Sequence, residues 1–293
     1  MDKHDTLVRL FSGEKQLPTL PVLFAEFTKL MEQPLASSKR VSELVMKDQA
    51  MVVKVLKLCN SALYSNRQEI TNLTGAINFL GLSTLRNLIL QISMVRLFSI
   101  DDEAIPEFRT TTFWEHSLAT AYFTQFLAKR LQLPHNENYY IAGLTHDIGK
   151  LAMYQFYPER FFAAVKNQLE AGTPDTVAEQ TVFGVDHADV GAFLAEKWRF
   201  KKEIGEAIQL HHSLSSPNIH LCTAVVRIAN FFSKAAGICF PWDRRVIDIV
   251  GDPAWTILAA YQEWIDVEKL TFELYEETPK VTAMVTELLS RRG

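Results

Sequence analysis

Apolar residues recur at helical spacing along almost the whole chain, and no stretch alternates apolar and polar residues convincingly, as a half-buried strand would. The pattern therefore predicts an all-α fold. A polar, charged stretch at 99–109 divides the chain into a front and a back part, and Pro106 would break a helix there. We expect an N-terminal helical bundle over residues 15–100, packed against a second helical lobe over residues 110–237.

The front lobe is predicted to contain several short amphipathic helices. Their boundaries are marked by one proline, two N-capping residues and one glycine: Pro34, Ser38, Asp48 and Gly81. Ser38 and Asp48 each stand just before an apolar helix face, where a side-chain oxygen can accept a hydrogen bond from a free backbone N–H. The last two helices of this lobe are predicted over 71–79 and 83–98, on either side of the glycine.

The back lobe is predicted to begin with a capping box at Thr112–Glu115, followed by a long helix to about Leu131. Shorter helices are expected over 137–147, 158–171, 175–183, 187–198 and 201–212. Ser216-Pro217 is typical of a helix start, and that helix would run to Gly237. Residues 238–293 are expected to form a C-terminal extension that contains two further helices.

Composition and charge narrow the class of protein. A chain of 293 residues with 48% hydrophobic residues can bury a large core without disulfides, and its three cysteines include no CxxC pair. The net charge of −4 offers no general attraction to nucleic acid or anionic lipid. The N-terminus lacks the apolar region of a signal peptide, and the apolar run at 85–98 is too short to span a bilayer. We therefore expect a cytoplasmic protein with no membrane partner and no direct nucleic-acid binding.

The main chemical signal is a set of polar side chains on otherwise apolar helices: His116, His146, Asp147, His187, His211 and His212. They lie on or at the ends of different predicted helices, as a metal site in the core of a helical bundle requires. Neutral imidazoles and carboxylates suit iron, manganese or zinc, and an Asp beside a His could bridge two ions. Lys150 is placed to neutralise phosphate charge near such ions.

Structural roles would also account for some of these residues. His211-His212 could be the polar end of a helix, where a protonated ring complements the helix dipole. His4, His135 and His220 are expected to have no ligand role, because they fall in a tail, a loop and a helix start. Asn60, Ser61 and Tyr64 could form a functional pocket, but short polar residues just after an apolar helix more often cap or turn it, and that is the role expected of them. Trp114 and Trp198 are expected in the core.

Several ordered motifs resemble a known family. Thr145-His146-Asp147-Ile148-Gly149-Lys150, with His116 upstream, is similar to the motif that names the HD superfamily of metal-dependent phosphohydrolases. Further motifs, in order along the chain, resemble the HDOD family, the HD-related output domains of bacterial signalling. They are Leu17-Pro18-Thr19-Leu20-Pro21, Lys47-Asp48, Asn60-Ser61-Ala62-Leu63-Tyr64, Ala76-Ile77-Asn78-Phe79-Leu80-Gly81, Asp186-His187-Ala188-Asp189-Val190-Gly191, and Trp198 ahead of His211-His212. The resemblance covers about residues 15–235.

This resemblance implies an HD-like back lobe but leaves the activity open. HD phosphohydrolases bind one or two metal ions and cleave phosphoesters, and the related HD-GYP enzymes hydrolyse cyclic di-GMP. Those enzymes complete their ligand set with an aspartate on a late helix, where this chain has Asn230. The Gly-Tyr-Pro element is absent as well. Many HDOD proteins have lost the metal ligands and act as regulatory or scaffolding modules, whereas this chain keeps all six candidates.

Three functions remain open from the sequence. The first is a bacterial signalling output module that retains an HD-type site for one or two divalent ions, iron or manganese before zinc, and presents its front lobe to signalling proteins. The second is an active phosphohydrolase acting on a phosphodiester or cyclic dinucleotide, with Asp147 and Lys150 as its catalytic residues. A phosphate-bearing small molecule would then be its ligand. The third is a metal-free scaffold.

Overall fold

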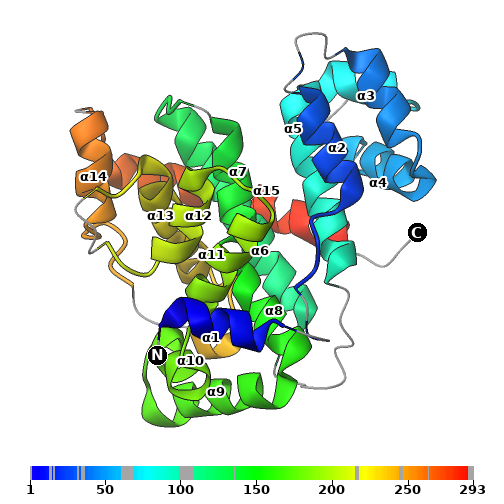
Figure 1. Ribbon diagram of the computed structural model, residues 1–293. Coiled ribbons are helices and arrows are strands. Elements are labelled where there is room, and N and C mark those ends of the chain that lie inside the picture. Colours follow the sequence, from blue (N-terminus) through cyan, green and yellow to red (C-terminus); the bar gives the residue numbers. More distant parts are fainter. Residues whose placement is uncertain are drawn as a thin grey trace. The chain divides into compact units, whose positions relative to one another are not determined.

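The computed structural model describes residues 2–12, 15, 17–31, 33, 37–60, 69–98, 108–134, 136–214, 218–243, 247–262 and 264–289. Over these residues the regular structure is helical, with one short 3-10 turn at Pro241–Asp243 (η1) and no strand (Figure 1). The prediction of an all-α fold is confirmed. Cys59, Cys222 and Cys239 are buried, and none of them forms a disulfide.

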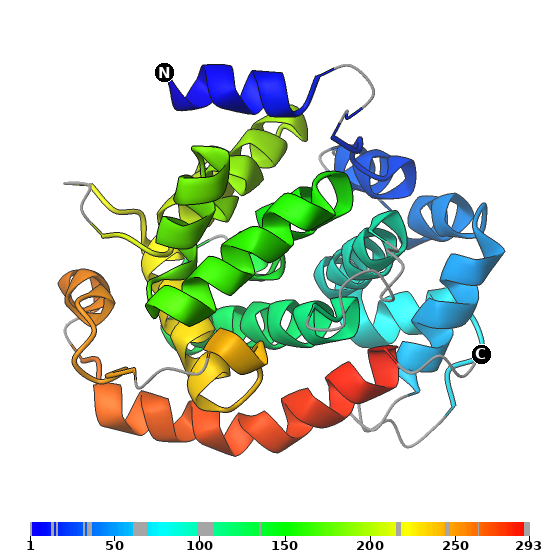
Figure 2. The ribbon, with the colours of Figure 1, turned by 90° about the horizontal axis from the view of Figure 1, so that it is seen from below.

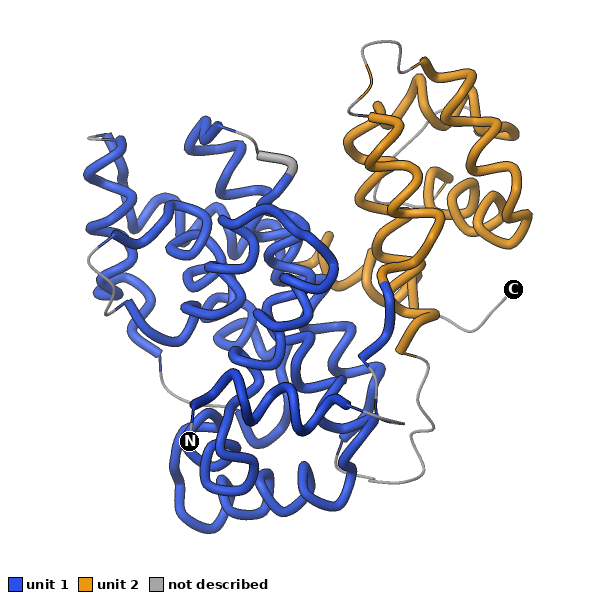
Figure 3. Tube along the Cα trace, viewed as in Figure 1, with its two compact units in different colours: residues 1–19, 100–278 blue, residues 20–99, 279–293 orange. Residues whose placement is uncertain are grey.

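The chain forms two compact units (Figure 3). Unit 1 comprises residues 1–19 and 100–278, and unit 2 comprises residues 20–99 and 279–293. The first unit therefore includes the N-terminal helix, which precedes the front lobe in sequence. The C-terminal region contributes to both units, because the division falls at residue 279 inside the last helix.

Unit 2 is built from four helices and the end of the last one. The four are α2 (Val22–Met31), α3 (Ser38–Val45), α4 (Gln49–Cys59) and α5 (Leu73–Leu97). Asp48 caps α4 as predicted, since its Oδ1 accepts a hydrogen bond of 2.9 Å from the Met51 N–H. The cap of α3 is Ser37 rather than the predicted Ser38, and it accepts from the Arg40 N–H at 3.3 Å.

Asn60 ends α4, and its side chain bonds to the backbone of Leu56 and Ile70. Its Nδ2 donates to the carbonyls of Leu56 and Ile70 at 3.0 and 2.8 Å, and its Oδ1 accepts from the Ile70 N–H at 2.7 Å. The capping interpretation of Asn60 is confirmed. Ser61 and Tyr64, for which the same role was predicted, lie outside the described residues.

Helix α5 is the core helix of unit 2. It joins the two predicted helices, and Gly81, with φ 77° and ψ 163°, marks the expected break as a kink. By length and composition α5 could cross a membrane, with a mean hydropathy of 1.2 over 18 residues. Within unit 2, however, it packs against α2, α3 and α4. The part beyond the kink has 16 residues (82–97) and spans about 24 Å, less than the roughly 30 Å of a bilayer core.

Unit 1 holds the remaining helices. They are α1 (Lys3–Leu10), α6 (Thr110–Arg130), α7 (Asn136–Thr145), α8 (Ile148–Phe156), α9 (Pro158–Ala171), α10 (Asp175–Phe183), α11 (His187–Lys197), α12 (Lys202–Leu210), α13 (Leu221–Ala235), α14 (Ala254–Tyr261) and α15 (Val267–Leu289), the last of which continues into unit 2. Helix α6 packs against α7 and α13, while α11 packs against α8 and α12. At the surface of the unit α1 lies against α11 (Figures 1 and 2).

Two predicted helix starts are wrong. Helix α6 begins at Thr110, and its N-cap Arg109 makes no side-chain capping bond. Phe108 and Phe113, the positions of a hydrophobic staple, are both buried, so burial rather than a cap fixes this start. Helix α13 begins at Leu221, because the Nδ1 of His220 accepts from the Cys222 N–H at 3.1 Å.

Helix α8, which carries Lys150, was not predicted. It starts at Ile148, directly after His146 and Asp147, and packs closely on α11. A Cβ atom at Gly149 would come within 2.0 Å of the His187 carbonyl oxygen. Glycine is therefore required for this close approach of α8 to α11. Because glycine lowers helix propensity, the sequence pattern did not predict a helix here.

Candidate metal centre

The fold gathers all six predicted ligand residues in unit 1. His116 comes from the middle of α6, His146 and Asp147 from the junction of α7 and α8, and His187 from the start of α11. His211 and His212 follow the last residue of α12. They form two groups with ligand atoms within 4.8 Å of one another, namely Asp147, His187, His211 and His212, and His116, His146 and Asp147.

Asp147 belongs to both groups, and each of its oxygens faces a different one. Its Oδ1 lies 3.1 Å from the Nε2 of His187 and 3.5 Å from the Nε2 of His211. Its Oδ2 lies 3.5 Å from the Nε2 of His146 and 3.8 Å from the Nε2 of His116. A carboxylate in this position can bridge two cations.

Four of the histidines use Nδ1 in the same way. Each places Nδ1 within hydrogen-bond distance of an oxygen acceptor: the Ile238 carbonyl for His116 (2.8 Å), the Gly143 carbonyl for His146 (2.8 Å), Glu179 for His187 (2.6 Å) and the Ile208 carbonyl for His211 (2.7 Å). These acceptors fix a hydrogen on Nδ1. The lone pair of Nε2 is thereby left available in each ring that is neutral, as in histidines that bind metals.

Several atoms that face the centre lack hydrogen-bond partners. The Nε2 atoms of His116, His146 and His211 and the Oδ1 of Asp147 are buried without one. The Nε2 atoms of His187 and His212 lie 2.8 Å apart. Buried polar atoms are normally satisfied, and a cation would satisfy all of these together. The donor set therefore fits a metal ion.

The charge around the centre is unbalanced. Four buried carboxylates, those of Asp147, Asp175, Glu179 and Asp243, all act electrostatically on Lys150. Among the described residues, two buried lysines oppose them. Lys150 pairs with Asp147 (2.9 Å) and Asp175 (3.0 Å), and Lys234 pairs with Asp243 (2.5 Å). With neutral imidazoles these described side chains carry an excess of two negative charges, which a bound cation would compensate.

Burial and neighbouring charges set the protonation states. Burial lowers the pKa of His116 to about 4 and the pKa of His146 well below its usual value, so both rings are neutral at pH 7. Burial also acts to lower the pKa of His187, but Glu179 and Asp147 outweigh it and raise this pKa to about 10. Without a metal, a proton on His187 thus offsets part of the excess negative charge.

Comparison with known proteins identifies the family. A family model for the HDOD domain matches residues 17–214, about two thirds of the chain. The chain belongs to the HDOD family, which is related to HD-type phosphohydrolases.

Several known proteins are similar to this chain. An HDOD domain protein of Geobacter sulfurreducens has a crystal structure with a TM-score of 0.87, 26% identity and 98% coverage of both chains. The structure of a protein of Shewanella amazonensis SB2B, named as a candidate phosphohydrolase, has a TM-score of 0.75 and 24% identity, covering 98% of this chain and all of the other. A protein of Treponema pallidum (strain Nichols) is 30% identical over 200 residues, which are 68% of this chain and only 38% of that relative.

Asn230 lies on α13, the late helix on which related enzymes carry a ligand aspartate. It is fully buried, and neither its Oδ1 nor its Nδ2 has a hydrogen-bond partner. Three residues before it on α13, Arg227 donates to the carbonyls of His211 (3.3 Å) and His212 (3.0 Å). Four residues after it, Lys234 acts electrostatically on His116 and His212. Helical spacing therefore puts Asn230 on the face of α13 turned toward the histidines.

The sequence did not single out four charged residues of the centre, namely Asp175, Glu179, Lys234 and Asp243. Asp175 and Glu179 lie four residues apart on α10, which is a detectable signal for a shared helix face. The same spacing is common on solvated helices, however. Lys150, which was predicted to neutralise phosphate charge near the ions, lies between two carboxylates, with 5% of its surface exposed.

The remaining predicted residues lie elsewhere. His4 is on α1 with its ring edge-to-face with Phe193, and His220 caps α13, so neither joins the centre. His135 lies outside the described residues. Trp114 and Trp198 are buried as predicted, and the Trp198 Nε1 donates to the Pro18 carbonyl at 2.8 Å.

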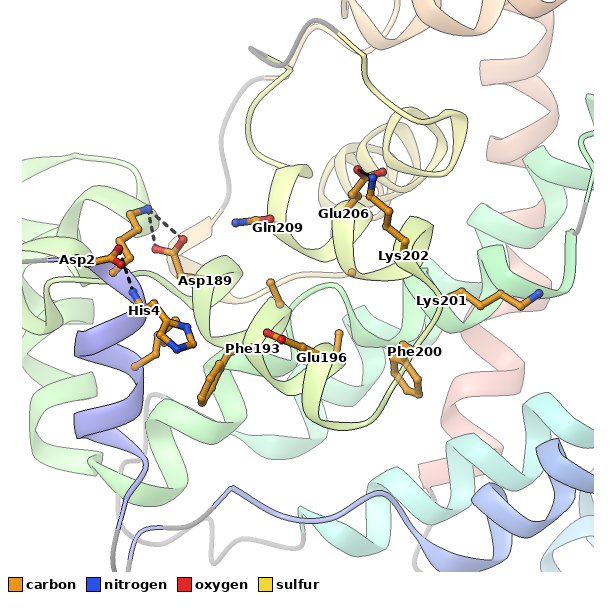
Figure 4. A pocket seen from close by; sticks show the side chains of 15 residues that line it. Asp2, His4, Asp189, Phe193, Glu196, Phe200, Lys201, Lys202, Glu206 and Gln209 are labelled. Atoms are coloured by element: carbon orange, nitrogen blue, oxygen red, sulfur yellow. Dashed lines mark hydrogen bonds and ion pairs between the residues drawn. The ribbon is translucent and has the colours of Figure 1, made fainter.

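A surface pocket in unit 1 is separate from the histidines. It has a volume of about 580 Å³ and lies between α1, α11 and α12. His4 and Phe193 lie side by side at one end, and Phe200 and Lys201 lie at the other (Figure 4). None of the six candidate ligands lines it. Lys3 joins its two walls through an ion pair with Asp189 at 2.8 Å.

Proposed function

We propose that this protein is a signalling output module of the HDOD type whose unit 1 binds divalent metal ions. The observation that carries the proposal is the position of Asp147 between two histidine groups whose Nε2 atoms are buried and mostly unpartnered. Imidazole nitrogen and carboxylate oxygen suit iron or manganese, with zinc as a further option. One divalent ion would balance the excess of two negative charges, and each of the two groups offers ligands for an ion.

In this proposal the ligands would be divided by group. One ion would be held by His187, His211, His212 and the Oδ1 of Asp147, and the other by His116, His146 and the Oδ2 of Asp147. Asn230 would add an amide oxygen from α13. Its neutral oxygen donates less charge than a carboxylate, so binding would be weaker than in a site with Asp at that position.

Unit 2 would provide the surface for signalling proteins. It exposes apolar side chains on three of its helices or at their ends, including Val22 (70% exposed), Met46 (54%) and Val53 (64%). Exposed apolar groups contribute to protein–protein contacts when they are buried by a partner.

A second candidate function, a metal-dependent phosphohydrolase, is favoured by the shared carboxylate and the buried lysine beside it. When bound, a pair of divalent ions supplies Lewis-acid stabilisation of the charge that develops on phosphoryl oxygens. Asp147 would hold the two positions at a fixed separation. Lys150, kept cationic by Asp147 and Asp175, would contribute positive charge to the same region.

Metal analysis tests the proposal. The protein should be purified anaerobically, without a His-tag or chelator, and its iron, manganese and zinc content measured per chain. We expect stoichiometric metal, and we expect His146→Ala to lower it. His4→Ala is the matched control, since His4 lies outside the centre. Absence of metal from the wild-type protein, even after addition of Fe²⁺ or Mn²⁺, would contradict both metal-based functions and support a metal-free scaffold.

Activity assays separate the two metal-based functions. The metal-loaded protein should be tested on phosphomonoesters, nucleotides and cyclic dinucleotides. Hydrolysis that His146→Ala abolishes and His4→Ala retains would establish the phosphohydrolase. Metal-loaded protein that hydrolyses none of them would support the output module.

A further inference from the structure

Glu179 differs from the other acceptors around the centre because it is a charged side chain. The Nδ1 atoms of His116, His146 and His211 bond to backbone carbonyls, which are neutral. One carboxylate oxygen of Glu179 instead accepts two buried hydrogen bonds from His187, from its Nδ1 at 2.6 Å and from its backbone N–H at 2.8 Å. A carboxylate bonded to a metal-binding imidazole orients the ring and raises its basicity.

The ring of His187 depends on this contact, whereas the start of its helix does not. Helix α11 keeps its capping box without Glu179, because Asp186 and Asp189 each accept a hydrogen bond from the other's backbone N–H (3.0 and 3.2 Å). In the described part of the chain, the Nδ1 of the fully buried His187 ring has Glu179 as its acceptor and no other. Without it, a neutral ring regains a hydrogen bond by moving its hydrogen to Nε2, which lies 2.8 Å from the Nε2 of His212. That hydrogen would then lie between two candidate ligand atoms.

The two oxygens of Asp147 favour the same side of the centre. We call the two sets of ligands the His187 group (Asp147, His187, His211 and His212) and the His116 group (Asp147, His116 and His146). The Oδ2 of Asp147, which faces the His116 group, is already in an ion pair with the Lys150 ammonium at 2.9 Å. The Oδ1, which faces the His187 group, is buried without a hydrogen-bond partner. A cation beside Oδ2 must therefore approach an ammonium, whereas a cation beside Oδ1 meets an unpartnered oxygen.

We propose that Glu179 is a positioning residue for His187, and that it makes the His187 group the one that binds the first metal ion. The inference rests on the proposed metal binding and adds an order of occupation to it. Glu179 holds the ring with its Nε2 toward the ion and increases the negative charge on that nitrogen through the bond to Nδ1. The His116 group is filled second, because it has three ligand residues rather than four and shares its carboxylate oxygen with Lys150.

The negative charge of Glu179 offers a different explanation, which substitutions separate from positioning. Removal of any buried carboxylate makes the centre less attractive to a cation, whether or not that carboxylate contacts a histidine. Asp243 provides the comparison, because it is also buried and also acts on Lys150 but is paired with Lys234. If charge alone were decisive, Glu179→Ala, Glu179→Gln and Asp243→Asn would weaken metal binding equally.

Titration of Mn²⁺ into the chelator-treated full chain provides the first test. Glu179→Ala should weaken binding of the first ion at least about tenfold, the range found when a group that orients a metal ligand is removed. Glu179→Gln keeps an oxygen acceptor without the charge, and the backbone N–H of His187 keeps that oxygen facing the ring. Its affinity for the first ion should therefore lie between those of Glu179→Ala and Asp243→Asn. Equal losses in all three variants, or wild-type affinity in Glu179→Ala, would overturn the inference.

Nitrogen NMR of ¹⁵N-histidine-labelled protein shows which group is filled first, with diamagnetic Zn²⁺ as the probe. In the wild-type protein, the first equivalent of Zn²⁺ should shift the Nε2 signals of His187 and His211 before those of His116 and His146. In Glu179→Ala this order should be lost, while circular dichroism shows an intact fold. Filling of the His116 group first in the wild-type protein, or an unchanged order in Glu179→Ala, would contradict the proposal.

Two further outcomes are decided by other measurements. If Glu179→Ala does not fold, the nearly isosteric Glu179→Gln replaces it, and a loss of affinity no greater than that of Asp243→Asn would refute positioning. A wild-type protein that binds neither Mn²⁺ nor Zn²⁺ would refute the proposed function. Positioning is then judged from the Nδ1 hydrogen of His187 in the metal-free protein, whose signal should lie far downfield because of the short bond to a carboxylate. If that signal does not move in Glu179→Gln, Glu179 does not position the ring.

Discussion

At the scale of single residues, Asp147 joins two sets of histidines because its two oxygens face different neighbours. The Oδ2 also forms an ion pair with the Lys150 ammonium at 2.9 Å. One carboxylate therefore contacts both histidine groups and a buried lysine. Burial acts to raise its pKa, but Lys150 and the nearby histidines outweigh burial and hold the pKa well below its usual value. The side chain is therefore ionised throughout the physiological range, which is the form that binds metals.

Asn230 is expected to limit metal affinity. Asn230→Asp replaces a buried, unpartnered amide with a carboxylate facing a region that would hold cations. We predict that it tightens Mn²⁺ binding about tenfold, because ligand charge is a main determinant of affinity. Isothermal titration calorimetry measures this directly.

Asn87 offers a matched control for this prediction. It is also buried with both side-chain atoms unpartnered, but it lies on α5 in unit 2, where no candidate ligand lies among the described residues. Asn87→Asp should lower the melting temperature equally with and without Mn²⁺. An Asn230→Asp variant with wild-type affinity would count against the placement of Asn230 at the centre.

The residue types explain which parts of the centre were predictable. Histidines on apolar helices are unusual enough to be noticed, and all six candidate ligands found in this way come together. Asp175, Glu179, Lys234 and Asp243 are charged residues that solvated helices and loops carry everywhere. Only the packing of α10, α13 and the loop after α13 shows that they are buried.

At the scale of elements, the close approach of α8 and α11 brings Asp147 next to His187. Gly149→Ala would place a methyl group 2.0 Å from the His187 carbonyl oxygen, so one of the two helices must move. We predict a loss of about 3 kcal/mol in the free energy of unfolding, the upper range for overpacking a core. Because Asp147 directly precedes α8 and His187 begins α11, displacement of either helix moves a ligand, and metal binding should weaken as well. Urea unfolding and Mn²⁺ titration measure the two effects.

Gly205 on α12 serves as the comparison for this substitution. A Cβ there would meet its nearest neighbour, the Ala195 Cβ, at an ordinary 3.9 Å. Gly205→Ala should therefore stabilise the protein by about 0.5–1 kcal/mol through helix propensity. If Gly149→Ala were equally stable, the proposed requirement for close approach would be wrong.

Sequence patterns predicted a helix end correctly only where an interaction between neighbouring residues fixes that end. Asp48 caps α4 through a bond three residues away, and that pattern is readable in the sequence. The start of α6 depends instead on the burial of Phe108 and Phe113, and α8 depends on contact with α11. Such tertiary causes leave no local pattern.

At the scale of the whole molecule, the tryptophans are distributed unequally between the units. All five, at positions 114, 198, 242, 255 and 264, fall within the residues of unit 1. Tryptophan fluorescence therefore reports unfolding of the unit that contains the candidate metal centre. Far-ultraviolet circular dichroism reports the helices of both units.

Removal of metal should consequently affect the two signals differently. Chelation leaves the excess negative charge of the centre uncompensated, so the fluorescence transition should move to lower temperature. At metal concentrations 100 times Kd, bound metal stabilises unit 1 by about 2.7 kcal/mol per site. A transition that circular dichroism detects and fluorescence does not should keep its midpoint temperature. A fluorescence transition insensitive to both chelator and Mn²⁺ would contradict this prediction.

The ligands come from α6, the α7–α8 junction, α11 and the end of α12, segments that span residues 116 to 212. An ion held among them would act as a cross-link that closes several long loops at once, much as a disulfide does. Separate helices would then unfold together rather than one by one. Because the ligand atoms are buried, the ion could leave only when those helices part, and its rate of release would measure how often this part of the protein opens.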